Sequence, residues 1–118
     1  MTETLRWNLP LLMQGQAQKE ISHNEALQTI DRILHLAVVT RGTGHPPANA
    51  TAGDSYIIGP APSGDWTSGV GLIAYYDGNG WILTSPRTGC LAWVCDESVL
   101  TVFVGNGWHT LSTLAGPV

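Results

Sequence analysis

Side chains that could do acid–base or metal chemistry are few and scattered in this sequence. The histidines lie far apart, at positions His23, His35, His45 and His109. Their spacing matches no metal-ligand pattern, so we expect no metal site. Asp96 and Glu97 form an acidic pair, but neighbouring residues of a strand point to opposite faces. A turn before Ser98 favours two solvated carboxylates over an acid–base dyad.

The motifs of nucleophilic and phosphate chemistry are also missing. The sequence contains no Gly-x-Ser-x-Gly elbow and no His-Glu-x-x-His, and Gly69-Val70-Gly71 lacks the following helix that a phosphate site requires. We therefore predict a protein that is not an enzyme, with no catalytic residue and no cofactor. A small hydrolase is an alternative, which a loss of activity on changing Asp77 and Asp96 would support.

The two cysteines, Cys90 and Cys95, lie five residues apart in a run that is typical of a strand. An odd spacing places them on opposite faces of such a strand, so a mutual disulfide would require a bend. Without further ligands they do not make a zinc site. We expect two reduced, buried thiols, with a crosslink between chains as the alternative.

The tryptophans offer a choice between core packing and binding. Trp93 lies in the apolar run 91–95 and is expected in the core, whereas Trp66 lies in a loop rich in glycine and serine and is expected to be exposed. An exposed aromatic ring can stack on a sugar. Three tryptophans are therefore candidates for contact with a glycan: Trp66, Trp81 and Trp108.

Length and charge narrow the function classes. The chain has 118 residues, of which 43% are apolar and 12% charged, and this suits a single small domain. Its formal net charge is -4 and Lys19 is its only lysine, so it has no basic surface for nucleic acid. It has neither a signal peptide nor an apolar run long enough for membrane insertion, and we expect synthesis in the cytoplasm.

One amphipathic helix is predicted over residues 22–40. Ser22 and Glu25 form a capping box at its start, and one face carries Leu27, Ile30, Leu34 and Val38. The opposite, polar side carries Gln28, Asp31, Arg32 and His35. The apolar face could pack on a sheet of the same chain, or it could form a subunit interface about a symmetry axis.

The remaining organisation is an arm, a linker and a β domain. Residues 1–21 form an extended N-terminal arm, residues 41–53 a linker rich in glycine and proline, and residues 54–118 a small β domain, with 22–118 as one folded unit. Six strands are expected, at 54–58, 70–76, 81–84, 91–95, 99–104 and 108–111. The predicted class is α+β, mostly β, with a small antiparallel sheet or barrel.

A short internal repeat supports the β assignment. Residues 76–81, Tyr-Asp-Gly-Asn-Gly-Trp, are echoed by residues 103–108, Phe-Val-Gly-Asn-Gly-Trp. Asn-Gly supplies the positive φ values that tight hairpin turns need. We expect two hairpins stacked in register.

The sequence resembles a phage-related domain family of uncharacterised function over residues 9–108. The motifs that carry this resemblance are Leu9-Pro10-Leu11-Leu12, Gly15-Gln16-Ala17-Gln18-Lys19, His23-Asn24-Glu25-Ala26-Leu27 with Asp31, Pro46-Pro47, Gly53-Asp54-Ser55-Tyr56-Ile57-Ile58, Gly64-Asp65-Trp66 and Leu91-Ala92-Trp93-Val94. The family occurs in tail-fibre and similar proteins of phages, prophages and gene transfer agents, especially of alphaproteobacteria.

The resemblance implies a structural component of a virion, such as a tail fibre, spike or receptor-binding attachment module. We expect a homotrimer that packs through the helix and contacts other tail or fibre proteins. The docking arm is predicted at Gln14, Gln16, Gln18 and Lys19, whose side chains can bond the main chain of a partner. The alternative function is a module that binds host cell-surface polysaccharide.

Overall fold

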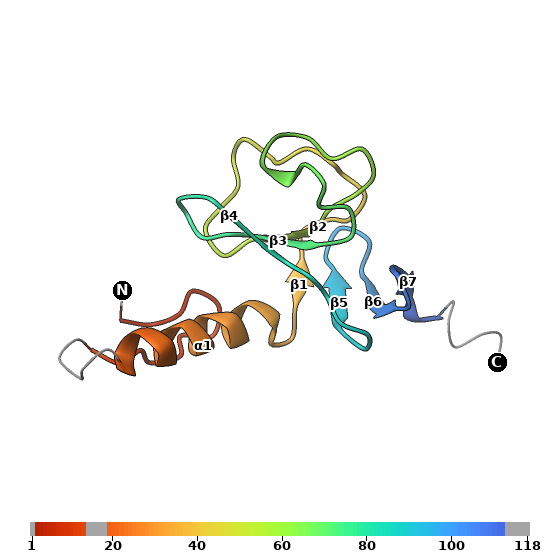
Figure 1. Cartoon of the computed structure of the whole chain (residues 1–118). Helices are drawn as coiled ribbons and strands as arrows, with labels where there is room; N and C mark the ends of the chain where they lie inside the picture. Colours follow the sequence, from red (N-terminus) through yellow and green to blue (C-terminus); the bar gives the residue numbers. More distant parts are fainter. Residues whose placement is uncertain (1, 14–18, 113–118) are drawn as a thin grey trace. The chain divides into compact units, whose positions relative to one another are not determined.

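A computed structural model describes residues 2–13 and 19–112, with only the backbone of Lys19 and Glu20. Contacts divide the chain into two compact units, residues 1–34 and residues 35–118. Over the described residues the units contain one α-helix, one short 3-10 helix and seven short strands in two sheets (Figure 1). The predicted class, α+β and mostly β, is confirmed.

The N-terminal unit consists of an arm over residues 2–13 and the helix α1, Lys19–Ile33. The arm closes into a loop, because Glu3 and Pro10 form an antiparallel bridge and the N–H of Thr4 donates to the carbonyl of Leu9 at 3.1 Å. An N-terminal arm is therefore present, but its predicted extended form is wrong, because main-chain hydrogen bonds fold it back on itself. The predicted limit at residue 21 is also wrong, because α1 already begins at Lys19.

The helix limits predicted from the sequence, 22–40, are wrong at both ends. Ser22 lies inside α1 and not at its start. At the other end His35 adopts a left-handed φ of 48°, which breaks the helical path. Ala37 and Val38 then form a strand. Apolar spacing over so few residues fits a helix or a strand, and pairing in the sheet decided the outcome.

The β unit contains a four-stranded and a three-stranded sheet. The first has the order β1-β5-β6-β7, with β1 Ala37–Val38, β5 Leu91–Val94, β6 Val99–Val104 and β7 Gly107–Thr110. The second has the order β2-β3-β4, with β2 Ser55–Ile57, β3 Ile73–Tyr76 and β4 Trp81–Thr84. All six predicted strands are confirmed with small shifts at their ends, and β1 is additional.

The segment 36–41 joins the two sheets because it forms hydrogen bonds along both of its edges. On one edge the carbonyl of Val38 accepts from the N–H of Cys95 at 2.9 Å, next to the parallel pairing of β1 with β5. On the other edge the N–H of Val39 donates to the carbonyl of Ser55 at 2.8 Å. The named strands otherwise pair antiparallel, as expected, so this parallel junction is the part of the topology that the sequence did not indicate.

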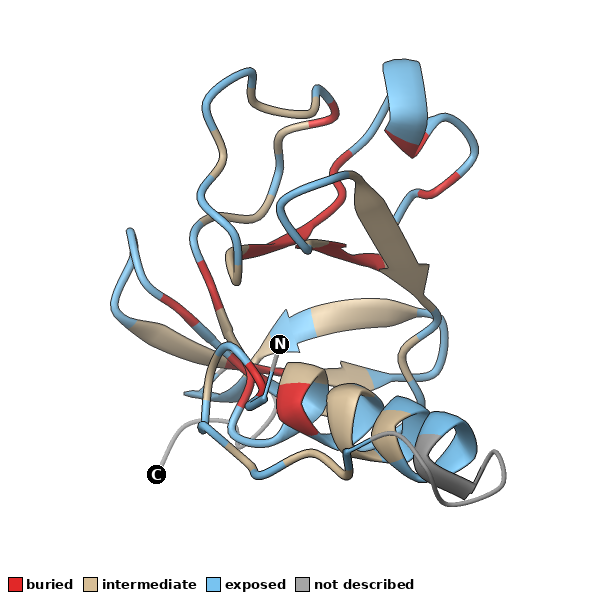
Figure 2. Cartoon of the chain, turned by 90° about the vertical axis from the view of Figure 1, so that its left-hand side faces the viewer, coloured by how far each residue is buried: buried red, intermediate tan, exposed pale blue. Residues whose placement is uncertain are grey.

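Two apolar clusters fill the β unit, on opposite faces of the three-stranded sheet. Successive strand residues point to opposite sides, so Ile57 and Ile73 join the first cluster while Tyr56 and Ala74 join the second. The first cluster also contains Leu36, Val38, Ala92 and Val94, and the second also contains Ile58 and Trp66. Figure 2 shows the buried residues concentrated in the β unit, whereas α1 is mostly intermediate or exposed.

The repeated sequence forms two hairpins, but they lie in different sheets and are not stacked in register. In the loop between β6 and β7, Gly105 has a φ of 66° at the first central position, where a type II′ turn needs glycine. Between β3 and β4, Gly78 has a φ of 99° and Asp77 Oδ1 accepts the N–H groups of Asn79 at 2.7 Å and Gly80 at 2.8 Å. The positive φ thus falls on the glycine before each asparagine, and not on Asn-Gly.

Candidate functional site

The buried side chains of the N-terminal unit are polar. Among its described residues only Thr4 and Asp31 are buried, with exposures of 1% and 0%. Asp31 lies on α1, and its carboxylate accepts the Thr4 hydroxyl at 2.7 Å and the main-chain N–H groups of Arg6 and Trp7, both at 2.8 Å. The placement of Asp31 on a solvent-facing side of the helix is therefore wrong, because the folded arm covers it.

Arg6 donates hydrogen bonds to main-chain carbonyls at the C-terminal end of the helix. Its Nη1 donates to the carbonyls of Asp31 at 2.9 Å, Arg32 at 3.3 Å and Leu34 at 2.8 Å, and the indole N–H of Trp7 also donates to Leu34, at 3.0 Å. The last carbonyls of a helix lack partners within the helix, and a cation near them is favourable. The arm therefore supplies the C-terminal cap of α1.

A second contact holds the arm closer to the N-terminus of α1, at Asn24. Asn24 accepts the N–H of Leu12 at 2.8 Å through Oδ1 and donates through Nδ2 to the carbonyl of Leu12 at 2.9 Å. Asn24 and Asp31 are seven residues apart and so lie on the same face of α1. Together they fix the position of the arm along the helix, a function that the sequence did not indicate for either residue.

The same unit leaves large apolar side chains exposed. On one side of the helix and its following turn, Ile30, Ile33 and Leu34 are 44%, 43% and 39% exposed, and Trp7 of the arm, bonded to Leu34, is 45% exposed. We call these four residues the apolar seam. Ile21 is 54% exposed but lies on the opposite side of α1, since nine residues correspond to about two and a half turns.

Two of the four residues predicted for subunit packing, Ile30 and Leu34, belong to this seam. Leu27 is half-buried on α1. Val38 is fully buried in β1 within the first cluster, so its placement on a helical face is wrong. The periodicity argument missed Ile33, and it missed Trp7 because the folding of the arm brings that ring to the helix end.

The predicted docking arm falls largely outside the described residues. Gln14, Gln16 and Gln18 are not described, and Lys19 is described only as the first backbone position of α1. Their assignment to contacts with neighbouring chains stays a prediction.

Trp66 is buried, whereas its loop sequence predicted an exposed ring. It ends the 3-10 helix η1, Gly64–Trp66, and is completely buried. Its ring centroid lies 5.1 Å from that of Trp81 and 5.6 Å from that of Tyr56. Burial in this cluster, aided by the nearby Asp54 carboxylate, raises the pKa of Tyr56. The turn folds the loop over the three-stranded sheet, so the predicted exposure of Trp66 is wrong.

The other tryptophans do not form a shared exposed surface with Trp66. Trp81 is half-buried in the second cluster, whereas Trp108 is half-buried against the first and donates its indole N–H to the carbonyl of Gly71 at 2.8 Å. Trp93, expected in the core, is 43% exposed. The three rings proposed for glycan contact are therefore not exposed together, and the expected core position of Trp93 is wrong.

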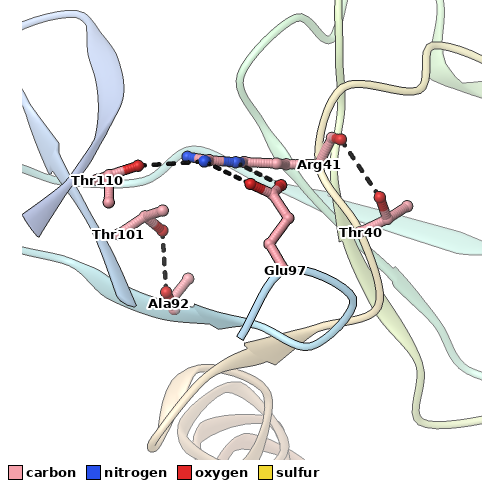
Figure 3. A network of polar contacts seen from close by, with 6 residues as sticks. All are labelled: Thr40, Arg41, Ala92, Glu97, Thr101 and Thr110. Atoms are coloured by element: carbon pink, nitrogen blue, oxygen red, sulfur yellow. Dashed lines mark hydrogen bonds and ion pairs between the residues drawn. The ribbon is translucent and has the colours of Figure 1, made fainter. Parts of the chain in front are cut away.

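An ion pair lies on the surface of the β unit (Figure 3). Arg41 donates through Nε and Nη2 to the two carboxylate oxygens of Glu97, at 2.9 and 2.8 Å, and through Nη2 to the hydroxyl of Thr110 at 3.1 Å. These hydrogen bonds raise the pKa of Arg41 and lower the pKa of Glu97. The group joins the segment 36–41, the β5–β6 turn and β7, so it acts as a surface clamp.

One hydrogen bond joins a potential nucleophile to a potential base. His45 Nδ1 contacts the Ser63 hydroxyl, and both residues lie in loops of the β unit. An activated serine also needs a group that orients the histidine and donors for the developing oxyanion. Among the described residues no acidic side chain bonds His45, and no three metal-binding side chains gather at one point.

Both cysteines are free thiols. Cys90 is partly buried beside the first cluster, and burial raises the pKa of its thiol. Cys95 is exposed, so its expected burial is wrong. It follows the last residue of β5, where the chain begins to turn.

The fold and these surfaces define a small, mostly β protein with a helical unit whose apolar side chains face outward. Residues 23–109 match the family described as a protein family of unknown function, DUF2793, and the chain belongs to this family. Comparison with curated proteins gave no match. In the described part of the chain, no helix has the length and apolar character needed to cross a bilayer.

Proposed function

We propose that this protein is a non-enzymatic structural component of a phage or phage-like particle, in which the N-terminal unit joins copies of the chain into a homotrimer. It would act in the virion as part of a tail fibre, spike or attachment module, in contact with other tail or fibre proteins. The particle assignment draws on the motif resemblance around residues 15–19 and 23–27, and the assembly role draws on the geometry of the N-terminal unit.

One observation carries the assembly role: the described residues of the N-terminal unit bury polar side chains and expose apolar ones. A segment of this length is too short to enclose a core by itself. A partner chain can remove its apolar seam from water, and burial of large apolar side chains is the main driving force for association. Copies of one chain around a symmetry axis offer identical seams to each other.

The polar contacts of the arm prepare the seam for burial. The indole N–H of Trp7 is already bonded to the carbonyl of Leu34, so its ring can be covered without leaving a buried donor unpaired. The Arg6 guanidinium lies 5.8 Å from the centre of the Trp7 ring, which helps to fix the ring's orientation. A fixed aromatic side chain of this kind is typical of the residues that dominate binding energy in interfaces.

The test is the solution mass of Ile30→Asp by light scattering. We expect the wild type at about three times the chain mass of 12.6 kDa and the variant near one chain mass, because a buried carboxylate without a partner is strongly disfavoured. Ile21→Asp is the matched control, since Ile21 is at least as exposed but lies on the opposite side of α1. Circular dichroism of both variants should retain the β signal.

Two results would overturn the assembly role. The first is a wild-type protein that stays monomeric at all concentrations, and the second is an equal effect of Ile30→Asp and Ile21→Asp. Trp7→Ala adds an independent readout, because Trp7 lies outside α1 and its loss cannot act through helix propensity. It should weaken association in the same direction as Ile30→Asp.

The alternative function, binding of host polysaccharide through Trp66, Trp81 and Trp108, stays a prediction. No observation favours it over assembly, because Trp66 is completely buried and the three rings are divided between two clusters.

A further inference from the structure

The outer side of the four-stranded sheet carries large apolar residues, as the buried side of a sheet normally does. On β5, Ala92 and Val94 point inward and are fully buried, while Leu91 and Trp93 point outward and are 48% and 43% exposed. An antiparallel sheet with one side in water normally carries polar residues on that side. The outward residues of β5 are instead large and apolar.

The strand register extends this pattern across the sheet. Residues that face each other on neighbouring strands point to the same side of the sheet. The partners of Leu91 and Trp93, and the residues that pair with those partners, therefore also lie on the outer side. These strand positions are Ala37, Leu91, Trp93, Leu100, Val102, Val104, Gly107 and His109. None of them is an acidic side chain, a lysine or an arginine. We call this set the outer apolar face.

A shallow hollow borders this face. It has a volume of about 410 Å³ and is lined mainly by carbon atoms of Val99, Leu100, Thr110, Leu111 and Ser112. Leu100 belongs to the hollow and to the outer apolar face alike, and Leu111 is 40% exposed. The hollow therefore touches the outer apolar face only at Leu100, because Val99 and Thr110 share the inner side of the sheet with Val94 and Thr101.

The size of the apolar seam indicates that assembly requires a second contact surface. A stable interface buries about 800 Å² and about 20 to 30 residues on each partner. The seam supplies four side chains, which is far short of that size. The outer apolar face adds the accessible side chains of Leu91, Trp93, Leu100 and Val104, the kind of composition found in the cores of interfaces, whereas Val102 on the same side is already buried at 7% exposure.

We propose that the outer apolar face is a second contact surface between copies of this chain, a proposal that rests on the assembly role given above. Each chain carries a net charge of -4, so like chains repel wherever charged surfaces approach. The strand positions of the outer apolar face hold none of these charges. A second copy can therefore approach this face at the lowest electrostatic cost. The occupant is therefore the β unit of a neighbouring copy.

The test is the concentration dependence of association, by sedimentation equilibrium, of the double variant Leu91→Gln/Trp93→Thr. Both replacements keep side chains that a strand tolerates. We expect association to weaken by about 30-fold or more, which is the loss expected from one dominant interface residue. Val70→Thr is the control, since Val70 is an apolar residue of the same unit at 59% exposure but lies outside this face.

Comparison with Ile30→Asp separates this proposal from the assembly role. If Ile30→Asp dissociates the protein while the double variant associates as the wild type does, the outer apolar face is not an interface and the assembly role stands. If the double variant dissociates and Ile30→Asp does not, this proposal is supported and the seam is excluded. If the wild type is monomeric throughout, both are overturned, and another part of the same chain or a different protein must cover the face.

A second variant keeps the test informative should the double variant fail to fold. Leu91→Gln alone removes one outward side chain and leaves the aromatic ring in place. It should weaken association in the same direction by a smaller factor. An unchanged association constant for this folded variant would count against the proposal.

Discussion

The two units of this chain are stabilised in opposite ways. All twelve buried hydrophobic residues of the described chain, from Leu36 to Val102, lie in the β unit. The N-terminal unit buries Thr4 and Asp31 and exposes Trp7, Ile30 and Ile33. The β unit thus has its own apolar core, whereas the N-terminal unit has a polar interior and exposes large apolar side chains.

The difference has a physical consequence for stability. Fully burying a large apolar side chain contributes about 1.5–3 kcal/mol, and the β unit sums many such contributions. A typical hydrogen bond contributes about 1 kcal/mol, somewhat more when the acceptor is charged, so the contacts of Asp31 fix geometry more than they add stability. We therefore expect the N-terminal unit of an isolated chain to open locally before the β unit unfolds.

The largest expected effect is the loss of the core ring of the β unit. Trp66→Ala should lower the free energy of unfolding by about 3–5 kcal/mol, because it leaves a large cavity between Tyr56 and Trp81. Thermal denaturation followed by circular dichroism measures this. The control is Trp93→Ala at low protein concentration, which should cost far less because Trp93 is 43% exposed. Equal losses would mean that the two rings do not differ in burial.

The next effect concerns the polar interior of the N-terminal unit. Asp31→Ala removes the acceptor for the Thr4 hydroxyl and two main-chain N–H groups, at an expected cost of about 2–3 kcal/mol. Hydrogen exchange should show faster exchange in residues 2–11, with the β unit unchanged. Asp65→Ala, at an exposed carboxylate, is the control. A global loss of stability in place of local opening would contradict the division into two differently stabilised units.

A third prediction tests close backbone packing in the β unit. A Cβ at Gly59 would lie 2.3 Å from the carbonyl carbon and oxygen of Gly42, so one backbone segment must move. Gly59→Ala should cost about 1–3 kcal/mol, as over-packing usually does. Gly80→Ala meets no atom within 4 Å and is the control. Similar melting temperatures for the two variants would show that the two segments are not packed as described.

The smallest effect is that of the surface clamp. The pKa of Glu97 is lowered by its hydrogen bonds to Arg41, so the clamp stabilises the fold above the unfolded pKa of about 4.3 and stops doing so as the pH falls through the lowered value. The difference in Tm between wild type and Glu97→Gln should be small at neutral pH, smaller in high salt, and absent in acid. A difference that grows in acid would contradict this sign.

The strands could be read from the sequence because their information is local. Short runs of apolar and β-branched residues in 81–84 and 99–104, with glycine turns between strands, are enough to place β4 and β6 at their observed limits. The hairpins at 76–81 and 103–108 were found for the same reason. The distribution of the two hairpins over two sheets was not predicted, because it depends on which distant strand each hairpin joins.

The candidate site was predicted less well, since it depends on contacts between distant residues. Ile30 and Leu34 were identified because helical periodicity is local. Trp7 was missed because only the folding of the arm brings it to Leu34, and Asp31 was misplaced because nothing near it in sequence shows that the arm covers it. For a similar reason Trp66 is buried although it was expected to be exposed, and Trp93 is exposed although it was expected in the core. Loop composition and apolar neighbours do not show which side of a sheet is covered.

The sequence alone determined the fold class, the presence of one amphipathic helix and six strands, and a net charge of -4. Each of these follows from composition or from periodicity within a few residues. Tertiary structure decided where α1 ends, because parallel pairing of 37–38 with β5 overrode the helical pattern. It also decided that the N-terminal unit buries Asp31 and exposes its apolar seam, because burial is a property of segments brought together in space and not of residues taken singly.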